Sequence, residues 1–212
     1  MTTLITILTE GYADWEIGLV AGVARGFYGL KVRHAAPGGR QLTSGGGLRV
    51  TPDLAIEAID LDTTAALIVC GGPIWQTDRA PDISALLVAA HEQDLLVAGI
   101  CDGTMALARA GLLDHAEHTS NSLETLLDTG YAGQTGYWDV PHAVAADHIV
   151  TAPGTAPVSF MAQILEGLGL ADGNLDRYLD LLAAEHAGRH YLPGTSRRAQ
   201  RTPADDRAGT GT

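Results

Sequence analysis

Cysteine is scarce in this sequence and long apolar runs are absent. Only 2 cysteines occur in 212 residues. The first segment, MTTLITILTEGYADWE, has no basic region before its short apolar run, and in this it differs from a secretory signal. In a reducing compartment, cysteines serve packing, catalysis or metal binding more often than disulfides. No run of about 18 apolar residues is present to cross a membrane. We therefore expect a cytoplasmic protein without a membrane partner.

Positive charge is also in short supply. Lysine and arginine number 13 against 25 aspartates and glutamates, which gives a formal net charge of -12. A nucleic-acid binder needs a basic face, so no nucleic-acid partner is predicted. With 46% hydrophobic and 18% charged residues, the composition is that of a folded chain. We expect a single domain over residues 1–192 and a disordered tail over 193–212, where residues become small and polar.

Short apolar segments alternate with helical patterns along most of the chain. Buried strands are predicted at residues 4–8, 30–36, 66–70 and 95–100. Helices are predicted at residues 14–27, about 82–93, 102 to about 111, 155–169 and 172–187. Residues 137–152 break this order and predict two strands joined at Asp147 and His148. Apolar strands alternating with helices are typical of a mostly parallel sheet covered on both faces, which predicts a three-layer α/β sandwich.

Cys101 stands where an apolar strand meets a helix, in the stretch AGICDGTMALARAGLL (98–113). Strand, nucleophile and helix in succession form an elbow that lifts a side chain clear of the backbone. The helix start would favour the thiolate, so we predict a lowered thiol pKa. The peptide N–H groups of Asp102 and Gly72 would be placed to bind an oxyanion. A buried structural cysteine is equally compatible with the residues alone.

Further polar residues are predicted at the same rim of the sheet, because ligands bind at the carboxyl ends of parallel strands. Glu16 follows the first strand, although it could equally be a carboxylate at a helix start. Gly71 and Gly72 follow the strand that ends at Cys70, and we predict that they help to bind substrate. Trp75 either walls this pocket or packs in the core. Cys70 lacks the elbow and is expected to be structural.

Two histidine pairs have spacings that could bind a metal. His115 and His118 stand three residues apart, and His186 and His190 stand four apart. Neither pair has a cysteine or another third ligand placed near it in the sequence. The prediction is that the protein binds no metal and needs no other cofactor.

Four stretches together resemble the ThiJ/PfpI superfamily, the flavodoxin-like group related to class I glutamine amidotransferases. They are TEGYADWE, CGGPIWQ, AGICDGTMALARAGLLDHAEHTSN and IVTAPGTAPVSFMAQILEGLG. The similarity covers roughly residues 3–170. It implies a flavodoxin-like fold, a small-molecule substrate and a homodimer.

The resemblance also implies roles for individual residues. Cys101 takes the place of the family's nucleophilic or oxidisable cysteine, Glu16 that of a carboxyl hydrogen-bonded to it, and His118 that of a catalytic histidine nearby. Gly72 and Asp102 would supply the oxyanion site. A carboxylate repels a thiolate, so Glu16 and Cys101 should share a proton. Peptidase-type members carry a histidine directly after the cysteine, whereas this chain has Asp102, whose side chain we expect to point outward from the helix start.

Three hypotheses about function follow. In the first, the protein is an enzyme whose Cys101 attacks an electrophilic carbon in amide hydrolysis or amidotransfer, in conversion of small 2-oxoaldehydes to hydroxy acids, or in isonitrile hydration. Asp102 makes classical peptidase activity the less favoured reaction. In the second, the protein is a non-catalytic thiol redox sensor or a chaperone-like stress protein. In the third, it is an interaction module that has lost its chemistry.

Overall fold

The computed structural model describes residues 3–187, so the predicted tail lies outside the described part of the chain. Its centre is a seven-stranded sheet in the order β5-β2-β1-β6-β7-β9-β8, in which only the β8–β9 pair is antiparallel. The strands of this sheet are β1 (Thr3–Ile7), β2 (Lys31–Ala36), β5 (Leu54–Ala55), β6 (Thr64–Val69), β7 (Leu96–Ile100), β8 (Val144–Ala146) and β9 (Ile149–Ala152). This is the α/β architecture that the alternating pattern predicts.

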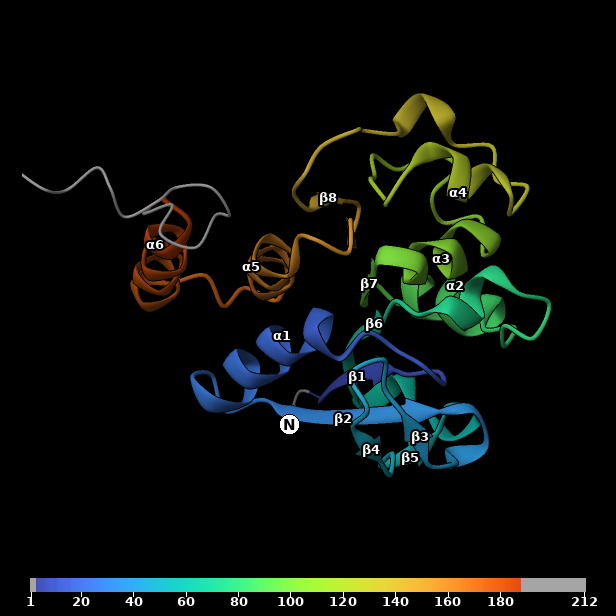
Figure 1. Cartoon of the computed structure of the whole chain (residues 1–212), viewed down its shortest axis with the longest axis horizontal. Helices are drawn as coiled ribbons and strands as arrows, with labels where there is room; N and C mark the ends of the chain where they lie inside the picture. Colours follow the sequence, from blue (N-terminus) through green and yellow to red (C-terminus); the bar gives the residue numbers. More distant parts are fainter. Residues whose placement is uncertain (1–2, 188–212) are drawn as a thin grey trace, which may run out of the picture.

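Helices cover both faces of the sheet (Figure 1). They are α1 (Asp14–Gly26), α2 (Ser84–Glu92), α3 (Thr104–Arg109), α4 (Leu123–Leu127), α5 (Pro157–Gly167) and α6 (Gly173–Ala187). Helices α1, α5 and α6 lie on one side, and α2, α3 and α4 lie on the other. The flavodoxin-like three-layer sandwich is therefore confirmed. Among the described residues, no helix has both the length and the apolar character needed to span a membrane.

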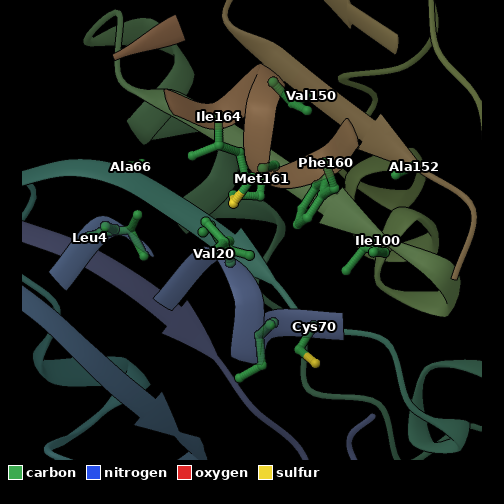
Figure 2. Packing of buried hydrophobic residues seen from close by; sticks show 14 of the residues in the cluster. Leu4, Val20, Ala66, Cys70, Ile100, Val150, Ala152, Phe160, Met161 and Ile164 are labelled. Atoms are coloured by element: carbon green, nitrogen blue, oxygen red, sulfur yellow. The ribbon is translucent and has the colours of Figure 1, made fainter. Parts of the chain in front are cut away.

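The strands of the sheet are apolar because both of their faces are buried. Every residue of β1 and of β7 is buried, as expected for central parallel strands. On one face, Val20 of α1 faces Phe160 and Met161 of α5 across the core (Figure 2). On the other face, Leu87 of α2 and Leu107 of α3 belong to a second apolar cluster. These two clusters hold the sheet rigid beneath its carboxyl edge.

The predicted break in the alternating pattern is a β-hairpin. Strands β8 and β9 pair antiparallel, and the turn between them consists of Asp147 and His148, which have φ values of 49° and 61°. The sequence pattern did not reveal the small second sheet, β3 (Leu42–Thr43) with β4 (Arg49–Val50). Strands of two residues are too short to show an alternation of polar and apolar side chains.

Candidate active site

Cys101 occupies a strained elbow at the carboxyl end of β7. A single turn of 3-10 helix, η5 (Cys101–Gly103), connects the strand to α3. Cys101 has a φ of 55°, a conformation that few residues other than glycine adopt. Such strain persists only where the surroundings enforce it, and it is common at functional sites. The residue is partly exposed, so the elbow does not enclose it completely in the core.

The elbow depends on close approach of the backbone at Gly103. A Cβ atom on this residue would overlap the carbonyl oxygen of Val69 in the neighbouring strand β6. Because both partners belong to a packed backbone, neither can move away at low cost. The glycine two residues after Cys101 is therefore explained by packing of the elbow against β6.

We expect Gly103→Ala to lower the free energy of unfolding by about 1–3 kcal/mol, the usual cost of overpacking. Urea denaturation followed by circular dichroism would measure the change. Gly22→Ala is the matched control, because Gly22 lies within α1 with no atom inside 4 Å of an added Cβ. The control should be as stable as the parent or slightly more stable. Equal stability of the two variants would contradict this account of the elbow.

Glu16 lies against the elbow from the first turn of α1. Its side chain is only 1% exposed, and its Oε2 accepts a hydrogen bond from the N–H of Gly71 at 2.9 Å. A Cβ on Gly154 would come within 2.9 Å of both Cys101 Sγ and Glu16 Oε1. The carboxyl and the thiol therefore meet between two glycines, as the resemblance implies for this pair.

The protonation of this pair differs from the prediction of a low-pKa thiol. Burial raises the pKa of Glu16 to about 7. Burial, together with the negative charges of Glu16 and Asp102, raises the pKa of Cys101 to about 12, against the opposing effect of a hydrogen bond from Asn121. The start of the short helix does not outweigh desolvation and two carboxylates. At neutral pH the sulfur keeps its proton, and Glu16 is the group poised to accept it.

Asn121 is a site residue that the sequence reasoning missed. Its Nδ2 donates to Cys101 Sγ at 3.1 Å and lies 3.2 Å from an oxygen of Asp102. Its Oδ1 accepts the N–H of Gly154 at 2.9 Å. The side chain thus links the nucleophile to the loop that follows β9. The HTSN stretch, which ends at Asn121, marked this segment, but nothing in it distinguished Asn121 from His118.

The prediction that Asp102 points outward is wrong. The residue is only 8% exposed, and its carboxylate accepts from Gln76 Nε2 at 3.0 Å and from Asn121 Nδ2 at 3.2 Å. No side-chain hydrogen bond caps the helix start here. Burial raises the pKa of Asp102, while both amide donors oppose the change. Two amides from other segments hold the carboxylate inward, beside the sulfur.

The structure gives His118 a different role from the predicted catalytic one. Its ring is fully buried, with Nδ1 2.9 Å from the carbonyl oxygen of Ala116 and Nε2 3.3 Å from the hydroxyl of Tyr131. The rings of Tyr131 and Tyr137 pack edge-on against it. Burial lowers the pKa of His118. With both ring nitrogens engaged, it anchors the segment before Asn121, and Asn121 reaches the sulfur instead.

Trp75 takes the second of its two predicted roles, whereas Gly71 differs from its prediction as a substrate-binding residue. Trp75 is fully buried in the apolar cluster on the α2–α3 face, and its indole N–H donates to the carbonyl of Cys70 at 2.9 Å. It packs in the core and does not wall the site at Cys101. The N–H of Gly71 is occupied by Glu16, so it is unavailable to an oxyanion. The peptide N–H groups of Gly72 and Asp102 are then the remaining candidate donors.

Cys70 is buried, as expected of a structural residue. Its Sγ lies 3.4 Å from the carbonyl oxygen of Ala13 and 3.9 Å from Glu16 Oε2. Burial raises the pKa of Cys70 well above its usual value, so it remains a protonated neighbour of Glu16. Over residues 3–187, no group of three or more histidine, cysteine or acidic side chains is arranged to hold a metal ion.

This combination of fold and site defines a class of flavodoxin-like α/β proteins with a cysteine at a strand-to-helix elbow and a buried glutamate beside it. The chain belongs to the DJ-1/PfpI family, whose model matches residues 2–167. This confirms the family resemblance inferred from the four sequence stretches.

Individual relatives are similar over most of the chain. The DJ-1 superfamily protein Atu0886 from Agrobacterium tumefaciens is 41% identical, with a TM-score of 0.85 over 88% of this chain and 100% of that one. A thiJ/pfpI family protein from Bacillus anthracis is 30% identical, with a TM-score of 0.78 over 87% and 92%. A Bacillus subtilis protein named uncharacterized protease YoaZ is 33% identical over 165 residues, covering 74% of this chain and 78% of the relative.

Proposed function

We propose that the protein is an enzyme in which Cys101 attacks the electrophilic carbon of a small molecule. The observation that carries this proposal is the contact between a strained, partly exposed cysteine and a buried glutamate whose pKa is raised to about 7. A general base works best when its pKa is near the working pH. The raised pKa of Cys101 would also suit a module without chemistry, but such a module has no need of the strained elbow or the glutamate.

In the proposed first step, Cys101 Sγ forms a bond to the carbon of a carbonyl or amide group. The π electron pair of the C=O bond moves to oxygen, and the thiol proton passes to Glu16. The peptide N–H groups of Gly72 and Asp102 stabilise the oxyanion. Glu16 then returns its proton to the leaving amine or to the product. Attack is thus coupled to proton transfer and needs no standing population of thiolate.

Among the reactions open to such a site, we favour amide hydrolysis or amidotransfer and conversion of 2-oxoaldehydes. The protease name of the Bacillus subtilis relative fits the first group. Peptidase chemistry with a histidine base is not supported, because Asp102 occupies the position after the nucleophile and His118 is held elsewhere. Turnover of methylglyoxal, glutamine and an isonitrile by the purified protein would test the proposal. Turnover of none of them, and of no other small amide or aldehyde, would contradict it.

A redox sensor is the second candidate, favoured by one contact. Asn121 Nδ2 already donates to the sulfur, and it could hold an oxygen of a sulfinate together with protonated Glu16. Peroxide, however, reacts with the thiolate, which the raised pKa of Cys101 keeps scarce.

We expect mild peroxide at neutral pH to leave Cys101 mostly reduced over a time in which a low-pKa thiol would be oxidised. Intact-mass spectrometry would follow the reaction, with Cys101→Ser as the control for oxidation elsewhere. A stable gain of two oxygens that depends on Cys101, in a protein without turnover, would favour the sensor over the enzyme.

A further inference from the structure

We propose that the Cys101 site selects electrophiles that carry no net negative charge, and that Asp102 is the residue that sets this selectivity. The inference rests on the proposed function, because it names the substrate class of the same nucleophile. It concerns the charge next to the reacting atom, and this charge follows from contacts already described. Uncharged carbonyl compounds and neutral amides belong to the favoured class, whereas 2-oxo acids do not.

The position of the Asp102 carboxylate is fixed by the fold. Gln76, from the segment after β6, and Asn121, from the segment after α3, hold one carboxylate oxygen each. Asn121 holds Cys101 Sγ through the same nitrogen atom. A single nitrogen atom of Asn121 therefore links the Asp102 carboxylate to the sulfur through two hydrogen bonds. Neutral amides satisfy its oxygens but do not cancel its charge.

Among the described residues, the side chains hydrogen-bonded to Asp102 and to the Cys101 sulfur are neutral amides and not cations. The largest charge effects on the pKa of the Cys101 thiol come from two carboxylates, Glu16 and Asp102. Arg109 of the following helix donates through its guanidinium to the carbonyl of Trp75, which packs in the cluster on the other face of the sheet. An anionic electrophile would approach two partly desolvated negative groups, where repulsion is less screened than in water.

Asp102 and Glu16 contribute differently to this selectivity. Glu16 takes up the thiol proton as the sulfur attacks, so its own charge is neutralised during the reaction. Asp102 has its oxygens occupied by amide donors and takes no part in that transfer. It is therefore the negative charge that an incoming group meets throughout the reaction, which makes it the specificity-determining residue.

Two alkylating agents of nearly equal size test the proposal without a known substrate. Iodoacetamide is neutral and iodoacetate is anionic. In each reaction the sulfur forms a bond to carbon, iodide leaves with the electron pair, and the thiol proton passes to Glu16 or to buffer. The experiment uses a Cys70→Ala background at low ionic strength. The rate with iodoacetamide divided by the rate with iodoacetate should exceed the same ratio for 2-mercaptoethanol by at least about tenfold. A ratio equal to that of the reference thiol would overturn the proposal.

Asp102→Asn should bring this ratio several-fold closer to that of 2-mercaptoethanol, mainly by speeding the reaction with iodoacetate. Glu166→Gln is the matched control, because it removes one exposed charge on α5 and should leave the ratio unchanged. If Asp102→Asn does not fold, the ionic strength can be varied for the parent protein, whose ratio should fall as salt screens the site. A ratio insensitive to both changes would refute a charge-based selection.

The alkylation result does not depend on turnover, so this inference and the proposed function can fail separately. A large rate ratio in a protein that turns over no substrate would uphold the charge selection and reject the enzyme. Where 2-oxoaldehydes are turned over, phenylglyoxal should be converted in preference to 4-carboxyphenylglyoxal, which undergoes the same reaction but carries an added carboxylate. A preference for 4-carboxyphenylglyoxal would reject the selection while keeping the enzyme.

Discussion

Cys101→Ser is expected to lower turnover of the true substrate by at least about 10³-fold, as loss of an enzymatic nucleophile commonly does. Serine keeps the size of the side chain and a hydrogen bond with Asn121, so the elbow should remain folded. Steady-state kinetics of the parent and the variant would measure the effect.

Cys70→Ala is the matched control for this experiment. Cys70 is buried, and its sulfur contacts only the edge of the site, at 3.9 Å from Glu16 Oε2. Turnover should change far less than in Cys101→Ser, while stability falls modestly because a small cavity is left. A Cys101→Ser protein with the parent's rate would disprove nucleophilic catalysis at this position.

Glu16→Gln should change reactivity and turnover in opposite directions. Glutamine can still accept the N–H of Gly71, so the local fold is kept. The negative charge of Glu16 and its hydrogen bond with the thiol both raise the pKa of Cys101. Their loss should therefore lower that pKa. More thiolate is then present at alkaline pH, so alkylation by iodoacetamide there should become several-fold faster, although the Glu16-dependent reaction near pH 7 is lost. Turnover should nevertheless fall by about 10²–10⁴-fold, because the proton acceptor is lost.

Parallel measurement of alkylation and turnover separates this account from a structural role for Glu16. If the glutamate only supported the fold, its replacement would slow turnover without systematically speeding alkylation. Glu166 is an exposed carboxylate on α5, so Glu166→Gln provides the control for a change of net charge. Faster turnover in Glu16→Gln would show that the carboxylate inhibits the thiol and does not serve it.

Much of the fold and the centre of the site could be predicted from local patterns. Apolar strands with intervening helices determine a parallel sheet, and the carboxyl ends of parallel strands share one edge. This rule places Cys101 after β7 and Gly71 after β6, and the structure brings Glu16 to both. The glycine that follows Asp102 marks the close approach of the elbow to its neighbouring strand.

The orientation and protonation of side chains could not be predicted in this way. Asp102 turns inward because Gln76 and Asn121, 26 and 19 residues away in the sequence, supply donors there. The pKa of Cys101 depends on desolvation, which only the packed structure reveals. His118 stands three residues before Asn121, and no local signal shows which of the two reaches the sulfur.

The most direct test of the central claim is the pH dependence of Cys101 alkylation by iodoacetamide, in the Cys70→Ala background with and without Glu16→Gln. Because Glu16 titrates near pH 7 and Cys101 near 12, the rate should follow ionisation of Glu16 near neutrality and rise again only at high pH. In the Glu16→Gln variant the neutral step should vanish, and the high-pH rise should move to lower pH. A single ionisation near 8.5, the usual thiol value, with the same profile in both proteins would contradict a shared proton between Glu16 and Cys101.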